Sequence, residues 1–194
     1  MEVLNSSQAR NGGKAARFGG VSSPASIRIP NRDSLVFGNA ATIDMWVRLD
    51  SMTGMNGWGS TVTDGTYAMT LVAKSHDREG AAFMVSSNGG MWAATYDGTW
   101  NDNSCTTYIA NPNIPIGTWF RTTYVVSTTG GIKYYVNKQL AYECNNARPS
   151  FTTVNSQDLY IGKFRDEWFP LDGAVQDIAI YKSALSGDQI QALQ

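Results

Sequence analysis

The last strand-like stretch of the chain, residues 174–181, carries the pattern that most constrains the fold. Its apolar residues alternate, but the alternation slips at Gln176 and Asp177. Two successive outward residues inside a strand indicate a β-bulge. Ser186 and Gln189 then have the spacing of a capping box, which predicts a short helix at the end of the chain. A bulged strand followed by a short closing helix is a specific arrangement.

Short stretches with strand periodicity recur along the chain, and none shows the periodicity of a long helix. Turn residues separate them, including a tight turn at 137–138, whereas 50–66 and 97–113 read as long polar loops and 74–80 as a charged turn. The pattern predicts an all-β fold, an antiparallel two-sheet sandwich with one short C-terminal helix. The expected strands before the last one are 26–29, 42–49, 67–73, 82–86, 90–96, about eight residues within 116–126 entered by a Gly-Thr turn, 132–136, 139–144 and 159–161.

Composition excludes several classes of function. The net charge is −1 and no run of Lys or Arg occurs, so we expect no nucleic-acid partner. No apolar run approaches the ~20 residues that cross a bilayer, so we expect no transmembrane segment and no membrane insertion. Residues 1–20 lack an apolar h-region, so we expect no signal peptide.

Two segments carry a family resemblance: GAVQDIAIYKSALSGDQI near the end, and GTWFRTTYVV followed by IKYYVNKQLAYE before it. Residues 16–194 resemble the laminin-G-like domains of the concanavalin A-like lectin/glucanase superfamily. The resemblance implies one jelly-roll domain of two curved sheets. Residues 1–15 are then an N-terminal arm or an edge strand. Lys138 stands where the family usually has glycine, which makes an ideal type I′ turn costlier.

The sequence favours a non-enzymatic protein. Glucanases of this fold carry their paired carboxylates on one strand, and no such acidic pattern occurs here. His76 is the single histidine and lies in the expected charged turn, which argues against a lyase site. A glycan-active hydrolase or lyase is therefore the weakest alternative.

Some relatives of this family hold one Ca²⁺, which needs several oxygen ligands. The resemblance implies Asp172 and Asp177 as calcium ligands, because they match acidic positions before and within the last strand of the family. Ser22 and Ser23 replace an acidic pair that the family often has. A structural calcium is the one cofactor that the sequence suggests.

Aromatic residues beside amides and carboxylates predict a carbohydrate site, since a flat ring packs on an apolar sugar face while polar groups bond hydroxyls. The alternative is that about half of these rings fill the core, Trp92 and Tyr96 among them. The candidate glycan-binding residues are Trp58, Trp92, Tyr96, Trp100, Asn101, Asp102 and Trp168.

Two functions follow from these features. The first is a surface component of a virion, such as a phage capsid decoration with glycan adhesion, whose partner is a neighbouring capsid protein and which forms a homo-oligomer. The second is a carbohydrate-binding, lectin-like module. The polar N-terminal arm and the single-domain length favour the first, with the virion surface as its location.

Cys105 and Cys144 are the two cysteines of the chain. They are too few for a disulfide scaffold and wrongly spaced for a zinc site. One bond between them in an oxidising setting and two separate buried thiols both remain open.

Overall fold

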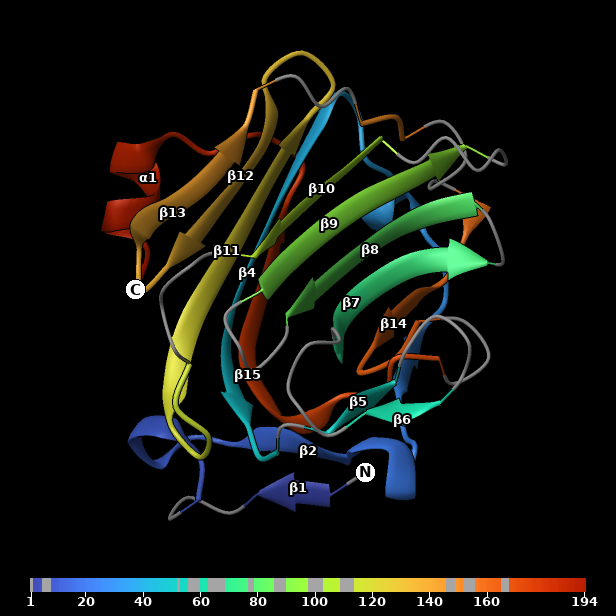
Figure 1. Ribbon diagram of the computed structural model, residues 1–194. Coiled ribbons are helices and arrows are strands. Elements are labelled where there is room, and N and C mark those ends of the chain that lie inside the picture. The colour runs from blue at the N-terminus through green and yellow to red at the C-terminus, as the bar shows by residue number, and fades with distance from the viewer. Residues whose placement is uncertain are drawn as a thin grey trace.

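Two β-sheets packed face to face make up the protein, with one short helix beside the larger sheet (Figure 1). The computed structural model describes residues 1–194 except 1, 5–7, 52, 56–59, 63–68, 77–78, 86–89, 98–102, 109–113, 146–148, 152–155 and 165–167. In the described part of the chain, no helix has the length and apolar character needed to span a membrane. The predicted antiparallel sandwich with a short C-terminal helix is confirmed.

The larger sheet has seven strands, and its neighbours are antiparallel throughout. In spatial order they are β1 (Glu2–Leu4), β2 (Ala15–Gly19), β15 (Asp172–Tyr181), β4 (Ala40–Leu49), β11 (Trp119–Ser127), β12 (Gly131–Val136) and β13 (Gln139–Cys144). The last strand of the chain, β15, therefore lies between two early strands.

The smaller sheet has six strands. In spatial order they are β10 (Asn103–Tyr108), β9 (Gly90–Asp97), β8 (Glu79–Val85), β7 (Met69–His76), β14 (Leu159–Ile161) and β3 (Ile27–Ile29). A separate two-stranded ribbon consists of β5 (Gly54–Met55) and β6 (Thr61–Val62), and three short 3₁₀ turns cover 10–12, 20–22 and 33–35.

Three predicted loops were wrong in part. The expected loop 97–113 contains β10. The sequence did not predict this edge strand, because its Asn, Ser, Cys and Thr residues show no alternation of apolar and polar positions. The expected loop 50–66 contains the β5–β6 ribbon. Strands β7 and β8 reach His76 and Glu79, so the charged turn is shorter than 74–80.

The core lies between the sheets and follows the period-two alternation of the strands. Tyr124 and Tyr134 of the larger sheet cross it to reach the backbone of the smaller sheet. The Tyr124 hydroxyl donates to the Met84 carbonyl at 2.6 Å, and Ala93 N–H donates to the Tyr134 hydroxyl oxygen at 2.9 Å. Burial raises the pKa of both phenols, so both stay neutral hydrogen-bonding groups.

The two terminal signals in the sequence are confirmed. The register between β15 and β4 shifts between Gln176 and Ala179, which is the predicted bulge, and Asp177 adopts φ 54° there. Helix α1 (Gly187–Ala192) begins after a capping box in which Ser186 Oγ accepts from Gln189 N–H and Gln189 Oε1 accepts from Ser186 N–H.

Lys138 occupies the predicted tight turn with φ 69° and compensates for the missing glycine. Its ammonium donates hydrogen bonds to the carbonyls of Gln191 and Leu193 at the end of α1. A cation at this place also suits the negative end of the helix dipole. The residue that strains the hairpin therefore fastens the C-terminal helix to it.

Cys144, at the end of β13, is a disulfide-bonded cysteine. Cys105 is the other cysteine of the chain, and its side chain lies outside the described residues. We expect Cys105 to be the partner. Such a bond would join β10 and β13, the edge strands of the two sheets.

Replacing Asp177 tests the bulge. Asp177→Ala should lower the free energy of unfolding by about 1 kcal/mol, because a Cβ without a polar side chain is disfavoured at this left-handed φ. Asp177→Gly is the matched control and should leave stability unchanged or higher. Urea unfolding followed by circular dichroism measures both, and equal losses in the two variants would contradict the interpretation.

Candidate functional site

The outer face of the larger sheet is closed beneath α1. Arg121 and Asp44 form a buried ion pair there, at 2.6 Å between Nη2 and Oδ2, with side chains 5% and 2% exposed. Thr123 donates to the same carboxylate at 2.6 Å. Ile190 of α1 is fully buried beside Val125, so the helix covers this part of the sheet.

The N-terminal loop, residues 8–13, closes the rest of that face. Gln176 accepts from Arg10 N–H at 2.9 Å and donates to the Arg10 carbonyl at 3.2 Å. The Arg10 guanidinium lies 3.5 Å from the centroid of the Trp46 ring, a stacked cation–π contact. Both chain ends therefore cover parts of this face, and a cavity of about 230 Å³ remains between β11, β12 and residues 184–187.

Three aromatic residues gather on the outer face of the smaller sheet. Phe164, Trp168 and Phe169, here called the aromatic cluster, pack on a floor made of Ala73, Ala82 and Met84. Phe164 N–H donates to the Trp168 carbonyl at 2.9 Å, which folds the segment back on itself. The ring centroids of Trp168 and Phe169 are 6.0 Å apart. Trp168 remains partly exposed, so the cluster presents an aromatic surface to solvent.

Backbone strain accompanies this cluster. Phe169 adopts φ 49°, which is uncommon for a bulky residue, and its carbonyl accepts from Thr70 N–H at 2.9 Å. The Thr70 hydroxyl is fully buried and has no hydrogen-bond partner in the described structure. Strained residues and unsatisfied buried polar groups concentrate at functional sites.

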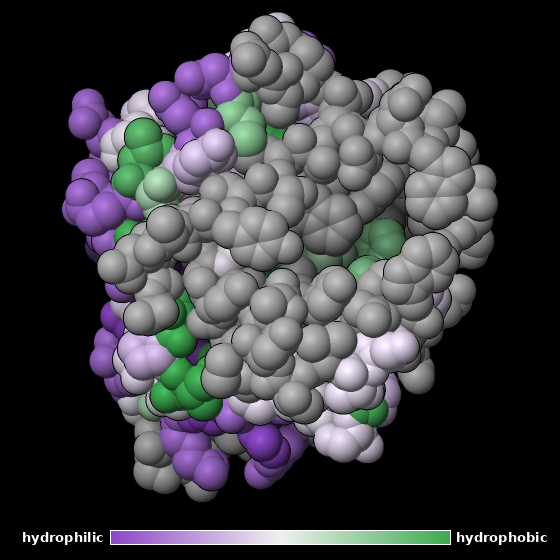
Figure 2. Space-filling model, in the orientation of Figure 1, coloured by the Kyte–Doolittle hydropathy of each residue, from purple (hydrophilic) through white to green (hydrophobic). Residues whose placement is uncertain are grey.

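Two predicted glycan contacts share this sheet face by register. Trp92 stands opposite Met84 and Tyr96 stands opposite Gly80, and directly opposed residues of antiparallel strands lie on one face. Their side chains lie outside the described residues. Figure 2 shows hydrophobic atoms of described residues on this side of the molecule.

The remaining candidates are divided. Trp168 is placed in the aromatic cluster. Trp58, Trp100, Asn101 and Asp102 lie outside the described residues. The sequence missed Phe164, Phe169 and the floor residues Ala73, Ala82 and Met84. The sequence signal for the floor residues was that β7 and β8 are apolar on both faces. Alternation alone does not show that the second apolar face packs outside the core.

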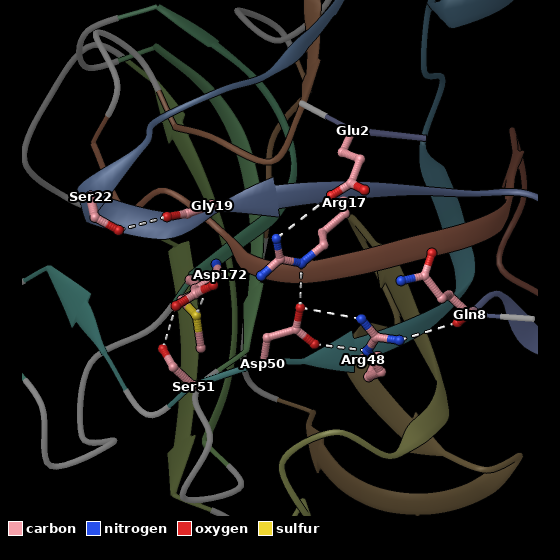
Figure 3. A network of polar contacts seen from close by, with 10 residues as sticks. Glu2, Gln8, Arg17, Gly19, Ser22, Arg48, Asp50, Ser51 and Asp172 are labelled. Atoms are coloured by element: carbon pink, nitrogen blue, oxygen red, sulfur yellow. Dashed lines mark hydrogen bonds and ion pairs between the residues drawn. The ribbon is translucent and has the colours of Figure 1, made fainter. Parts of the chain in front are cut away.

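The two predicted calcium ligands are not brought together. Asp172 is the first residue of β15, and its carboxylate accepts a hydrogen bond from Ser51 Oγ at 2.5 Å (Figure 3). Asp177 lies five residues further along β15, at the bulge. Five residues of strand span roughly 15 Å, far more than one ion held at about 2.3–2.6 Å allows. The described residues also contain no group of three or more potential metal-ligating side chains. The donor set around Asp172 therefore does not fit a calcium shared with Asp177.

An ion-pair network stabilises the strand ends beside Asp172. Arg17 and Arg48 both donate to the Asp50 carboxylate, at 2.9 and 2.7 Å, as Figure 3 shows. Burial alone would raise the pKa of Asp50. The hydrogen bonds from Arg48 and Arg17 outweigh it and hold this pKa below its ordinary value. This network is structural, since each oxygen of Asp50 accepts from an arginine.

A buried lysine and an ion pair lie where β7, β14 and β3 of the smaller sheet meet. Lys74 of β7 is 1% exposed and donates to Asn31 Oδ1 at 2.8 Å and to the Gln157 carbonyl at 2.6 Å. Burial lowers the pKa of Lys74 to about 8, although the negative charge of Asp158 acts in the other direction and raises this pKa. The Asp158 carboxylate accepts from Asn31 N–H and from Arg28, and these contacts lower its pKa.

The pH dependence of stability tests the burial of Lys74. An unfolded lysine titrates near 10.5, so between about pH 8 and 10.5 the unfolded chain binds more protons than the folded one. The free energy of unfolding should therefore increase as the pH rises from about 8 to 10.5. Urea titrations at pH 7.5, 8.5 and 9.5 measure it. Lys74→Met should reduce the slope and Lys14→Met, at an exposed position, should not; equal slopes in both would contradict the prediction.

Solved structures with this fold were found across a range of proteins. Domain 4 of AbnA, an extracellular GH43 arabinanase from Geobacillus stearothermophilus solved with arabinotriose, aligns over 93% of this chain and 76% of that chain, with a TM-score of 0.63 and 22% identity. The binding domain of Paraclostridial Mosquitocidal Protein 1 aligns over 98% of this chain, with a TM-score of 0.70 and 15% identity. The heptameric SAP-like pentraxin of Limulus polyphemus aligns over 86%, with a TM-score of 0.55 and 13% identity.

Botulinum neurotoxin type C, which depends on two ganglioside molecules to enter cells, aligns over 98% of this chain with a TM-score of 0.69 and 15% identity. This chain spans 44% of that toxin chain and 44% of the mosquitocidal binding domain. At these identities the likeness shows the fold alone. No curated protein matches the chain.

The family model described as "Concanavalin A-like lectin/glucanases superfamily" matches residues 21–191, nearly the whole of the two-sheet sandwich. The fold, the bulged last strand and the capped terminal helix agree with this match. The chain belongs to the laminin-G-like branch of the concanavalin A-like lectin/glucanase superfamily.

Proposed function

We propose that this protein is a non-enzymatic carbohydrate-binding module whose glycan site is the outer face of the smaller sheet. The observation that carries the proposal is the aromatic cluster, a partly exposed Trp168 supported by Phe164 and Phe169 on that face. An aromatic ring with a rigid support can stack on the apolar face of a sugar with little loss of conformational entropy. Trp92 and Tyr96 extend the same face by register.

Neighbours of this fold support a binding role. The arabinanase domain was solved with arabinotriose, and the type C neurotoxin depends on gangliosides. Both ligands are carbohydrates or carry them. Because these neighbours share the fold alone, the argument for this chain rests on its own aromatic surface.

The absence of a predicted catalytic pattern supports a non-enzymatic role. Hydrolysis of a glycosidic bond needs two carboxylates with defined separation, and the sequence shows no such pair on one strand. Asp158, at the edge of the proposed face, is committed to hydrogen bonds from Arg28 and Asn31. We therefore expect bound glycans to be released unchanged, without new reducing ends.

Replacing Trp168 tests the glycan site. Trp168→Ala should weaken retention on glycan columns at least roughly tenfold, because one stacked ring supplies on the order of 1–3 kcal/mol of contact. Trp100→Ala, at another residue that the sequence predicts to contact the glycan, should do the same. Trp119→Ala is the matched control, since Trp119 lies on the covered outer face of the larger sheet. Melting temperatures separate lost binding from lost folding, and unchanged retention in Trp168→Ala would contradict the proposal.

A virion surface role with capsid partners and a homo-oligomeric state stays a prediction. Residues 8–13 dock on their own sheet through Arg10 and Gln176, so an arm contact with a neighbour would use other residues or require their release. Closed symmetry is how surface assemblies usually present such domains.

Light scattering of the purified protein tests the assembled state. A trimer or larger closed assembly is the expected result for a surface component. Deletion of residues 1–13 should lower the assembled mass if the arm joins neighbours, and a fully folded monomer in both forms would contradict the virion role.

A further inference from the structure

One corner of the proposed glycan face combines an aromatic ring with cations. Arg28 of β3 stands opposite Tyr160 of β14, and Tyr160 stands opposite Ala73 of β7, so all three lie on the outer face. Ala73 is also part of the floor under the aromatic cluster. The corner and the cluster are therefore continuous.

Lys163 connects the two. Its ammonium lies 5.2 Å from the centroid of the Tyr160 ring, and the next residue, Phe164, belongs to the aromatic cluster. Gly162 before it has φ 88°, and a Cβ there would lie 2.5 Å from the Phe18 ring. This position therefore needs glycine, and it sets the direction in which Lys163 leaves β14.

The charges of this corner are unequal. Among the described residues, Arg28 and Lys163 are the two cations of this outer corner and Asp158 is its carboxylate, whereas Lys74 stands opposite the core residue Ala81 and lies on the inner side of β7. Arg28 pairs with Asp158 at 2.5 Å. Lys163 has no ion pair in the described part of the chain.

We propose that Lys163, beside Tyr160 and Arg28, binds the anionic group of an acidic glycan, a carboxylate or a sulfate. This inference rests on the proposed glycan-binding function and names its ligand class. The Lys163 ammonium donates to the anionic oxygens. Arg28 adds to the positive potential while its pairing with Asp158 keeps it in place beside Tyr160. The aromatic cluster next to it takes the apolar face of the sugar.

The experiment uses the full chain and pairs of glycans that differ in charge alone. Retention is measured on an array that holds sialylated and asialo glycans, sulfated and unsulfated glycans, and oligogalacturonides with and without methyl esters. The variants are Lys163→Met and the control Lys14→Met, which removes an equal charge at an exposed site far along the chain. Single-stranded DNA is included as an anion without a glycan.

The expected result is preferential binding of the acidic member of at least one pair. Lys163→Met should weaken that binding roughly fivefold and leave the neutral members unaffected, while Lys14→Met changes neither. Raising the ionic strength should weaken acidic binding alone. The carboxylate and sulfate pairs decide which anionic group is bound.

Four outcomes would overturn the inference. The acidic-glycan assignment would be contradicted by equal binding of both members of every pair, or by unchanged binding in the Lys163→Met variant. Either result would leave the proposed glycan-binding function in place. DNA bound as tightly as the acidic glycans, with the same loss in Lys163→Met, would show a general anion surface. No retention on any glycan would refute the proposed function together with the inference.

Discussion

Two tyrosine hydroxyls that cross the core fix how the sheets are arranged. Tyr124 and Tyr134 start from neighbouring strands of the larger sheet, their rings meet edge to face at 5.5 Å, and each bonds the backbone of the smaller sheet. The bonds end at Met84 and Ala93, in β8 and β9. Buried hydroxyls with well-aligned partners are costly to displace, so the backbone directly beneath the proposed glycan face is held at a defined depth.

The two ends of the chain cover much of the outer face of the larger sheet. A buried Asp44–Arg121 pair needs cover from water and complete hydrogen bonding, because an uncompensated buried charge is strongly destabilising. The C-terminal helix and the N-terminal loop provide that cover, one through Ile190 and the other through Arg10. In the described part of the chain the one α-helix lies beside the larger sheet (Figure 1), and the outer face of the smaller sheet carries the aromatic cluster and, next to it, Lys163 beside Tyr160.

The features that the sequence predicted correctly are those that depend on neighbouring residues. The bulge at Gln176 and Asp177, the capping box at Ser186 and the hairpin at 137–138 are local, because each depends on neighbours in sequence, and each was predictable. Strand β10 was missed because an edge strand needs no apolar alternation. The pairing of β15 between β2 and β4 joins residues more than 120 positions apart, and no local signal encodes such a partner.

The sequence by itself determined the fold class, the approximate positions of most strands and the presence of surplus aromatic residues, since periodicity and capping depend on neighbouring residues. Trp168 was a sequence candidate, but its supporting partners Phe164 and Phe169, and the floor of Ala73, Ala82 and Met84, were not. Only the tertiary structure gathered Phe164, Trp168 and Phe169 on the smaller sheet, and it placed Lys163 and Arg28 around Tyr160. The physical reason is that a binding surface is assembled from strands paired across long loops, and the free energy that selects that pairing comes from burial of the whole core rather than from any single stretch.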